Sequence, residues 1–416
     1  MRLLNNEDRR AIASQLLMFW INIHGFVSGR LRTTISGSPN RPLIRHSLRV
    51  TLRCRTSICI GLSKVVSMSK PQVRVGIVGA GTNTRVRHIP GLRAVTGVEI
   101  VSVSNRTTAS SERVAKEFSI PQVVERWQDL VASPDIDAVM IGTWPNMHCE
   151  VTCAALAAGK HVLCEARMAC DLAEARKMLA ASQAHPQLTA QIVPSPFGLE
   201  VGAKVQKLLA DNFIGQLREF VVIAADDQFW DYSRPIHWRQ DPSLSGKNVL
   251  TLGIMHETLS RWIPAPTRVY AQAAVFETER PDPAANGYRN CVVPDSVQIL
   301  TQTEAGARGI YHLSGTTLFG PGKQIHLYGS RGTLKIVFGA KEQIFAGYHS
   351  HSELKELDLA PETRGGWRVE AEFIGAIRGE EPIQYTTFAD AVRDMEFTEA
   401  VSQSVAQHQS VSLPLA

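Results

Sequence analysis

Two glycines separated by one residue end a strongly apolar segment near residue 80. Val73–Gly79 reads VRVGIVG and continues into Ala80 and Gly81. A continuous apolar run that ends in glycine is typical of a strand buried on both faces. Where such a strand opens into a helix, backbone N–H groups and the helix N-terminus can hold a pyrophosphate. The turn predicts dinucleotide binding by a set of six consecutive residues: Gly79, Ala80, Gly81, Thr82, Asn83 and Thr84.

The sequence departs from the usual dinucleotide-binding fingerprint at two places. Thr84 stands where the third glycine is expected, so the packing of helix against strand must accommodate a side chain there. The next apolar run, Val98–Ser104, ends in Asn105 and Arg106 rather than in an acidic residue. A carboxylate at this place would bind the ribose hydroxyls and repel a 2′-phosphate, whereas a neutral amide followed by a cation favours that phosphate. The sequence therefore predicts that NADP is preferred over NAD.

Further apolar runs alternate with segments of helical length. The strands and helices that this alternation predicts must position the glycine turn. Strands separated by helices imply parallel pairing with right-handed crossovers, and hence a doubly wound sheet. We expect this Rossmann domain over residues 71–195. The predicted strands are Val73–Gly79, Val98–Ser104, Ala138–Gly142, His161–Glu165 and Leu188–Pro194, and the predicted helices are Ser110–Phe118, Asn146–Ala158 and Asp171–Ala184.

The composition excludes several classes of protein. Hydrophobic residues make up 44% and charged residues 20%, which is a globular balance. Residues 1–70 hold 12 of the 44 lysines and arginines but only two acids, Glu7 and Asp8, so the remainder is slightly acidic. This charge argues against nucleic acid as a partner. No membrane association is expected, because Leu16–Val27 is shorter than the roughly 20 apolar residues of a membrane span.

Residues 1–70 are set apart from the fold as a leader, for which two interpretations remain. Arg30–Arg55 is rich in Arg and Ser and has no acidic residue, as in organellar transit peptides, which would make the protein mitochondrial. Alternatively, translation begins at Met68, just before the first strand, and the upstream residues are a gene-model artefact. The second interpretation predicts a cytoplasmic protein.

The cysteines predict neither disulfides nor a metal centre. The seven cysteines lack the paired spacing of a secreted scaffold, which favours reduced thiols. His148, Cys149 and Cys153 lie close together along a predicted helix, but a fourth ligand at a suitable spacing is missing. We therefore predict no bound metal.

Several linked segments resemble the Gfo/Idh/MocA oxidoreductase family. They include Thr143–His148 (TWPNMH), Ala154–Glu165 (AALAAGKHVLCE), Trp238–Pro242 (WRQDP) and Leu327–Leu334 (LYGSRGTL). With the helix Val369–Arg378 and the C-terminal end, the resemblance extends over residues 72–415. It implies a Rossmann domain followed by a C-terminal α/β domain with a large open sheet. It also implies that a small-molecule substrate, usually a sugar or polyol, lies between that sheet and the nicotinamide.

The second half of the sequence agrees with this layout. Beyond Pro196 the apolar runs become longer and more alternating, and few helices separate them, so neighbouring strands should be antiparallel. We expect a second domain over residues 196–416 with a mostly antiparallel sheet, through which copies of the chain form a homo-oligomer. The C-terminal helical segment should pack back near the first domain. The predicted strands are Leu217–Ala225, Arg268–Phe276, Ser296–Thr303, Arg308–Ser314 and Gln324–Tyr328.

The family resemblance also places residues along the cofactor, but one motif departs from the pattern. Relatives usually have Glu-Lys-Pro where this chain has Glu165-Ala166-Arg167, and the family lysine helps to position substrate and cofactor. Ala166 can neither donate a hydrogen bond nor carry charge, and the guanidinium of Arg167 cannot shuttle protons because of its high pKa. The cofactor-binding residues implied by the resemblance are Thr143, Trp144, Pro145, His148, Glu165, Ala166 and Arg167.

The family's catalytic aspartate and histidine are altered as well. If Gly253 is aligned with the family glycine, Thr251 and Met255 occupy the two catalytic positions. If the Trp238–Pro242 segment is aligned without a gap, His256 takes the histidine position and the aspartate is still absent. His256 is then either a displaced acid/base or an ordinary histidine near a helix start. Nearby, His237 and Lys247 are the best substitutes for proton transfer.

These observations leave more than one function open. The first is an NAD(P)-dependent oxidoreductase that acts on the CH–OH group of a sugar, polyol or related small hydroxy compound, with an atypical catalytic set. The second is an NADP-binding pseudoenzyme that acts as a sensor or regulatory partner. The third is a lyase or glycosidase that retains its cofactor, as some relatives of the family do.

Overall fold

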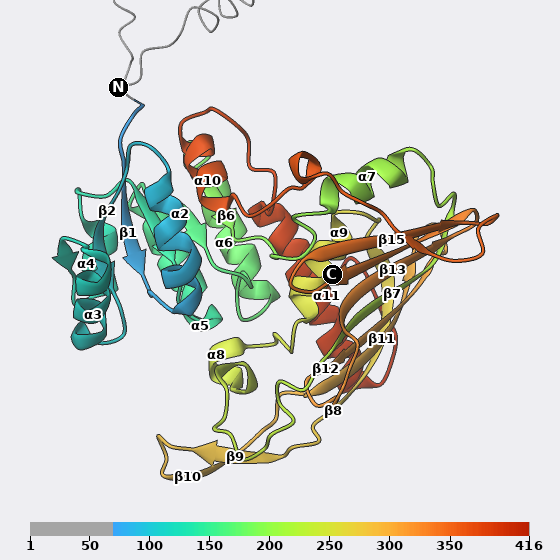
Figure 1. Ribbon diagram of the computed structural model, residues 1–416. Helices are drawn as coiled ribbons and strands as arrows, with labels where there is room; N and C mark the ends of the chain where they lie inside the picture. The colour runs from blue at the N-terminus through green and yellow to red at the C-terminus, as the bar shows by residue number, and fades with distance from the viewer. Residues whose placement is uncertain (1–69, 416) are drawn as a thin grey trace, which may run out of the picture. The chain divides into compact units, whose positions relative to one another are not determined.

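The computed structural model describes residues 70–415 (Figure 1). The predicted leader, apart from Lys70, lies outside the described residues. The described chain folds around two sheets, one of six strands and one of nine.

The six-stranded sheet is parallel throughout, in the order β3-β2-β1-β4-β5-β6. This is the doubly wound sheet that the alternation of strands and helices predicted. Its elements are β1 (Val73–Val78), a π-helical turn (Thr84–His88) leading into α2 (Ile89–Ala94), β2 (Val98–Ser104), α3 (Thr108–Phe118), β3 (Gln122–Val123), α4 (Trp127–Ala132), β4 (Ala138–Ile141), α5 (Pro145–Ala157), β5 (His161–Cys164), α6 (Leu172–Ala184) and β6 (Ala190–Ile192).

The apolar runs of this sheet are continuous because both faces are covered. In β4, Val139 and Ile141 belong to one hydrophobic core, whereas Ala138 and Met140 belong to another. All four side chains are fully buried. Alternate residues of a strand point to opposite faces, so a strand buried on both sides needs apolar residues at every position.

The nine-stranded sheet is mostly antiparallel, in the order β16-β15-β14-β13-β7-β12-β11-β8-β17. One pair differs from the expected antiparallel arrangement, because β12 runs parallel to β7. Its strands are β7 (Leu217–Ala225), β8 (Pro266–Ala274), β11 (Ser296–Thr303), β12 (Arg308–Ser314), β13 (Gly322–Gly329), β14 (Gly332–Phe338), β15 (Glu342–Tyr348), β16 (Lys355–Glu356) and β17 (Val411–Ser412).

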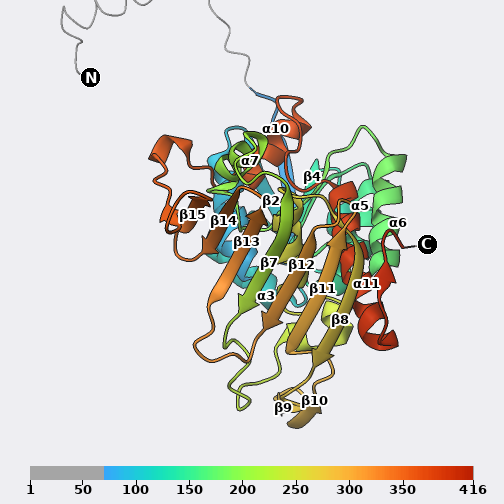
Figure 2. The ribbon, with the colours of Figure 1, turned by 90° about the vertical axis from the view of Figure 1, so that its right-hand side faces the viewer.

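Within residues 70–415, helices cover one face of this large sheet and leave the other face open. Met255 and Leu259 join Phe397 and Val401 in the core beneath the strands. Figure 2 shows β7, β12, β11 and β8 from the opposite side, where no helix of the described chain lies over them. The remaining elements are α7 (Gly202–Ala210), a 3₁₀ turn (Trp238–Gln240), α8 (Pro242–Ser245), α9 (Leu252–Ser260), the hairpin β9 (Glu279–Asp282) and β10 (Gly287–Asn290), a 3₁₀ turn (Pro361–Thr363), α10 (Val369–Ile377) and α11 (Phe388–Gln407).

The two last helices return to the first sheet, as predicted for the C-terminal segment. Phe373 and Ile374 of α10 belong to one of the two cores of the six-stranded sheet, and Phe388 and Met395 of α11 belong to the other. The helices that begin at Val369 and Phe388 therefore complete the cores of a domain that the chain began at Val73.

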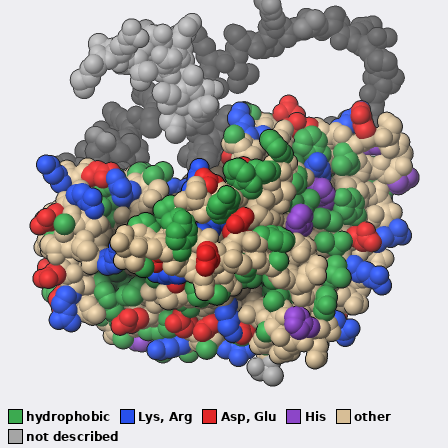
Figure 3. All heavy atoms as spheres, turned by 90° about the horizontal axis from the view of Figure 1, so that it is seen from below, with side chains coloured by type: hydrophobic (Ala, Val, Ile, Leu, Met, Phe, Trp, Pro, Cys, Tyr) green, Lys and Arg blue, Asp and Glu red, His purple; other side chains and the backbone are tan. Residues whose placement is uncertain are grey.

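Two surface properties bear on the partners of this chain. Among residues 70–415, no helix has both the length and the apolar character needed to cross a membrane. On the face of the molecule seen in Figure 3, basic and acidic side chains are interspersed rather than gathered by sign.

Candidate active site

The glycine turn after β1 requires glycine for steric reasons. Gly79 has a φ of 84°, in the left-handed region that L side chains rarely adopt. A Cβ at Gly79 would lie 2.5 Å from Cγ2 of Thr143 and 2.7 Å from its backbone nitrogen. The Gly79 N–H donates to the Ser104 carbonyl at 2.9 Å, and the Ala80 N–H donates to Oδ1 of Asn105 at 2.6 Å. These bonds hold the turn against the end of β2.

Thr84 is accommodated because a glycine on the neighbouring strand leaves room for it. The Thr84 side chain is buried, and its hydroxyl donates to the Gly79 carbonyl at 3.2 Å. A Cβ at Gly142, just after β4, would lie only 2.0 Å from Oγ1 of Thr84. The helix begins here with a π-helical turn. Gly142 has no side chain, and this absence makes room for the side chain of Thr84.

A cavity of about 740 Å³ opens at the carboxyl ends of β1, β2 and β4. Ligands of doubly wound sheets bind at this edge, and a cavity of this size is suited to a dinucleotide. Two polar atoms of residues in its wall, Oγ1 of Thr143 and Oδ1 of Asn146, are buried without a hydrogen-bond partner among the described residues. Buried polar atoms are normally paired, so these two atoms suit a polar ligand. The residues present therefore fit the cofactor that the glycine turn predicted.

Basic side chains gather at the end of this cavity that includes Asn105. Arg106, Arg113 and Arg126 all line it, and Glu125 is the one acidic residue among the described residues of the lining. The Arg106 guanidinium lies 5.8 Å from the ring centroid of Trp144. Sequence reasoning identified Arg106 but missed Arg113 and Arg126, because no spacing rule links α3 or the start of α4 to the glycine turn. The three cations are suited to an additional phosphate.

The structure brings only part of the predicted cofactor set into this cavity. Seven of the residues line it: Gly79, Ala80, Gly81, Asn105, Arg106, Thr143 and Trp144. The other predicted residues lie outside its lining: Thr82, Asn83, Thr84, Pro145, His148, Glu165, Ala166 and Arg167. Several of this second group form a polar cluster after β5.

Glu165, the residue that follows β5, is held by a buried histidine that the sequence did not reveal. Nε2 of His88 lies 2.9 Å from Oε1 of Glu165, and Nδ1 of His88 lies 2.6 Å from Oε1 of Glu370 in α10. Burial lowers the pKa of His88, but hydrogen bonds to the two carboxylates outweigh that effect and raise it to about 9. His88 is therefore protonated at neutral pH. The amide of Asn83 also donates to Glu165.

His148 supports the backbone rather than the cavity. Its ring is fully buried, with Nε2 3.1 Å from the Thr143 carbonyl and Nδ1 2.9 Å from the Arg167 carbonyl. Burial lowers the pKa of His148. The ring thus lies between the segment after β4 and the segment after β5, and as a neutral imidazole it donates its single N–H to one of these two carbonyls.

Arg167 lies in an unusual environment for a cation. The residue is 6% exposed, and its Nε and Nη2 atoms are buried without a hydrogen-bond partner among the described residues. Burial, followed by the positive charge of Arg239, lowers the pKa of Arg167 to about 9. The neighbouring Ala166 contributes only its methyl group, as the sequence indicated.

His237 lies next to the cofactor cavity, through its neighbour Trp238. The rings of Trp144 and Trp238 stack with centroids 6.3 Å apart. Nδ1 of His237 accepts the Arg239 N–H at 3.2 Å, and burial and the charge of Arg239 lower the pKa of His237 to about 4. A neutral ring whose Nδ1 is occupied as an acceptor carries its proton on Nε2. His237 can therefore donate a hydrogen bond but has no free lone pair to accept a proton.

Lys247 is placed at the surface, where it pairs with α11. Its ammonium group forms an ion pair with Glu399, and its side chain is 42% exposed. The backbone N–H of Lys247 donates to the Cys170 carbonyl at 2.8 Å. Its side chain does not line the cofactor cavity.

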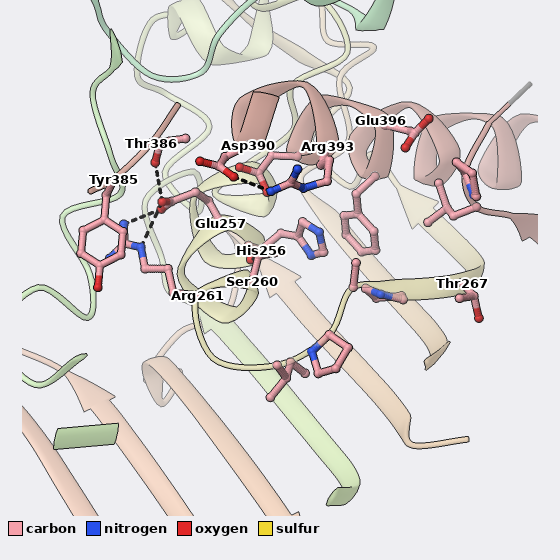
Figure 4. Close-up of a pocket in the computed structure, with 18 of the residues that line it drawn as sticks. His256, Glu257, Ser260, Arg261, Thr267, Tyr385, Thr386, Asp390, Arg393 and Glu396 are labelled. Carbon is pink, nitrogen blue, oxygen red and sulfur yellow. Dashed lines mark hydrogen bonds and ion pairs between the residues drawn. The ribbon is translucent and has the colours of Figure 1, made fainter. Parts of the chain in front are cut away.

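His256 lies in a different part of the structure from the cofactor cavity. Its ring is stacked on Phe397 of α11, with centroids 3.6 Å apart and an angle of 4° between the planes. Nδ1 lies 2.9 Å from the hydroxyl of Tyr311, and burial lowers the pKa of His256 to about 3. Figure 4 shows His256 in a separate cavity of about 570 Å³ beside α9 and α11. This cavity shares no lining residue with the cofactor cavity, and the placement does not favour His256 as a displaced base.

Comparison with known families identifies both halves of the described chain. Residues 73–192 match the oxidoreductase family with an NAD-binding Rossmann fold, GFO/IDH/MocA. Residues 203–335 match the GFO/IDH/MocA C-terminal domain.

Individual relatives act on sugar-related compounds according to their names. A dTDP-3,4-didehydro-2,6-dideoxy-alpha-D-glucose 3-reductase of Streptomyces antibioticus is 29% identical over 341 residues, which is 80% of this chain and 97% of that protein. A 1,5-anhydro-D-fructose reductase of Ensifer adhaerens is 41% identical over 110 residues, 26% of this chain and 33% of that protein. Levoglucosan dehydrogenase in complex with NADH and L-sorbose shares the fold, with a TM-score of 0.75 and 19% identity over 82% of this chain and 99% of that chain.

Proposed function

Because the chain belongs to the Gfo/Idh/MocA family of NAD-binding oxidoreductases, we propose that it is an NADP-dependent enzyme that oxidises or reduces a small hydroxylated compound such as a sugar or polyol. The observation that carries the proposal is the cavity beside the glycine turn, with its unpartnered polar atoms and three arginines. The names of the relatives support the substrate class.

In this proposal the chain divides its tasks between two domains. Residues 71–195 bind the cofactor and residues 196–416 form the substrate side, with α10 and α11 returning to the first sheet. The N–H groups of Gly79 and Ala80 shape the glycine turn through their own hydrogen bonds, and the N–H of Gly81 takes the pyrophosphate. Arg106, Arg113 and Arg126 bind the 2′-phosphate. When bound, the nicotinamide supplies or accepts the hydride.

Proton handling differs from the family pattern in this proposal. His237, which is next to Trp238 and retains a free Nε2–H, donates a hydrogen bond to the substrate oxygen. The proton of the substrate hydroxyl is exchanged with water, or with Lys247 when its ion pair with Glu399 opens. We assign no proton transfer to His256, because its ring is enclosed between Phe397 and Tyr311.

A second candidate is an NADP-binding protein without net turnover of its cofactor, either a sensor that has lost hydride chemistry or a lyase or glycosidase that retains its cofactor. Two observations favour it. Ala166 replaces the family lysine, and neither His237 nor His256 has a free acceptor nitrogen directed into the cofactor cavity. Turnover of NADPH with sugars and polyols separates the two candidates.

The open face of the large sheet supports a homo-oligomer. Tyr270, Leu300 and Ile310 are 44%, 56% and 48% exposed, and they face each other across β8, β11 and β12 because Leu300 pairs with both of the others. Three neighbouring exposed apolar side chains suit contact with a second copy of this chain. Sedimentation of the parent and of Leu300→Lys tests this part of the proposal.

The cofactor proposal is tested by calorimetric titration with NADPH and NADH. A charge-assisted contact to a phosphate contributes about 1.5–3 kcal/mol, so NADPH should bind about tenfold or more tightly than NADH. Arg106→Asp should invert this order, and Arg126→Gln should weaken NADPH binding while leaving NADH binding unchanged. Lys341→Gln, at an exposed turn between β14 and β15, is the matched control. Equal affinities in the parent would contradict the NADP preference.

A further inference from the structure

We infer that the substrate carries an anionic group, a carboxylate or a phosphate, and that Arg167 binds this group together with Arg239. This inference rests on the proposed function, because it describes the substrate of that reaction. Binding of the anion can nevertheless be measured separately from the reaction. Neither arginine is part of the cofactor cavity lining.

The first support is the missing partner of Arg167. Its guanidinium has two buried nitrogen atoms, Nε and Nη2, without a hydrogen-bond acceptor among residues 70–415. A buried cation without a partner is costly, and native structures retain one where another charge completes the site. A planar guanidinium is suited to two parallel hydrogen bonds from a carboxylate or phosphate.

The second support is that the two acids in the same small cavity as Arg167 do not bind its guanidinium. A cavity of about 30 Å³ is lined by Arg167 and also by Glu257 and Asp394. Glu257 is occupied by Arg261 at 2.6 Å and by the Thr386 hydroxyl at 2.6 Å. Burial and the charge of Glu257 raise the pKa of Asp394 well above its usual range, and neither acid accepts a hydrogen bond from Nε or Nη2 of Arg167. Neither acid therefore binds these two nitrogen atoms of Arg167.

The third support is the charge of the surrounding cluster. Both oxygens of Glu165 accept hydrogen bonds already, Oε1 from Asn83 and His88 and Oε2 from the Ala166 N–H at 3.1 Å. His88 is protonated and shared by Glu165 and Glu370. The three cations His88, Arg167 and Arg239 outnumber the two carboxylates, Glu165 and Glu370, that His88 holds. An anionic ligand would balance this excess of positive charge.

The cofactor itself does not account for this excess. The pyrophosphate of a dinucleotide is expected at Gly79 and Gly81, at the end of β1. The 2′-phosphate is expected at the arginines beside Asn105. Arg167 follows β5, two strands away from β1 in the sheet order, and an oxidised nicotinamide adds positive rather than negative charge. The missing anion therefore belongs to the substrate.

Aromatic rings beside Arg239 indicate what kind of anion fits. The Arg239 guanidinium lies 4.2 Å from the ring centroid of Trp238, and Trp238 stacks on Trp144. Flat aromatic faces suit the C–H face of a sugar ring, and a few polar groups then fix its orientation. The substrate class is thus an acidic sugar derivative, either a sugar acid or a sugar phosphate.

The test is calorimetric titration of the full chain, saturated with NADPH, with three probes: D-glucuronate, glucose 6-phosphate and uncharged glucose. At least one charged probe should bind about tenfold or more tightly than glucose. The two charged probes distinguish a carboxylate site from a phosphate site. Arg167→Gln should weaken binding of the preferred anion by about tenfold or more, with NADPH affinity unchanged, and Arg167→Lys should restore part of it. Lys341→Gln serves as the charge-matched control.

Two results overturn the inference: no charged probe binds more tightly than glucose, or Arg167→Gln binds the anion as tightly as the parent does. If Arg167→Gln does not fold, Arg239→Gln takes its place, and the comparison of probes in the parent still decides. Failure of the proposed function looks different. NADPH would not bind, or anions would bind without any turnover of NADPH.

Discussion

Truncation of His256 to alanine should destabilise the fold without removing a proton carrier. The ring is buried between Phe397 and Tyr311, and burial lowers its pKa to about 3, so it is neutral at pH 7. In this environment the imidazole acts as a packing residue with one hydrogen bond. His256→Ala removes the stacked ring and leaves the Tyr311 hydroxyl without that partner.

The size of the effect follows from these two contacts. An aromatic pair contributes about 0.5–1.5 kcal/mol beyond its buried area. A buried hydroxyl that loses its partner costs about 1–3 kcal/mol. The free energy of unfolding should therefore fall by about 1.5–4.5 kcal/mol, which is large for one residue. NADPH affinity should not change, because no residue lines both cavities.

Urea unfolding of the parent, His256→Ala, Tyr311→Phe and the double variant measures this prediction. Tyr311→Phe is the matched control, because it removes the hydroxyl and keeps the ring. Since the two residues share one hydrogen bond, their effects should not add, and the double-mutant cycle should return a coupling of about 1 kcal/mol. A loss of stability below about 1 kcal/mol, together with a fall in turnover of about 100-fold, would refute this reasoning and make His256 a general base.

Three further predictions follow from other contacts. Gly142→Ala should destabilise the protein by about 1–3 kcal/mol in urea unfolding, since its Cβ would lie 2.0 Å from Oγ1 of Thr84, and Thr84→Gly should relieve part of that loss. Burial lowers the pKa of His88, but its two carboxylate partners raise it to about 9, above the usual 6.5. The contribution of His88 to the free energy of unfolding is therefore complete below pH 6.5 and is lost as the pH rises through about 9. Unfolding measured between these pH values should show this loss in the parent and not in His88→Gln. Asn105→Ala should weaken NADPH binding about tenfold in calorimetry, because the Ala80 N–H loses its acceptor and the glycine turn loosens; unchanged affinity would show that the turn holds its shape without this bond.

The strands and the cofactor turn could be read from the sequence because their signals are local. The run VRVGIVG and its glycines lie within nine residues, and a strand buried on both faces needs apolar residues at each position. The predicted strands before residue 195 and the longer ones after it are present with small changes at their ends. β14 and β15 were not predicted, and neither was the parallel pairing of β7 with β12, since a strand's own residues do not state which neighbour it will join.

The site was decided by tertiary structure because its partners are far apart in the chain. His88 meets Glu370 across 282 positions, and no spacing rule connects them. Arg113 and Arg126 join Arg106 only when α3 and the start of α4 pack beside the glycine turn.

The orientation of His256 was likewise decided by tertiary structure and could not be predicted from the sequence. Successive residues of a helix point about 100° apart, so alignment on Gly253 or on Trp238 places different residues on the face toward the cofactor. In the folded chain, Gly253 packs against the stem of Arg167, and His256 turns to Phe397. Sequence determined which residue types were available for chemistry, and helix packing determined which of them face the site, because the direction of a side chain depends on neighbours that the chain supplies from elsewhere.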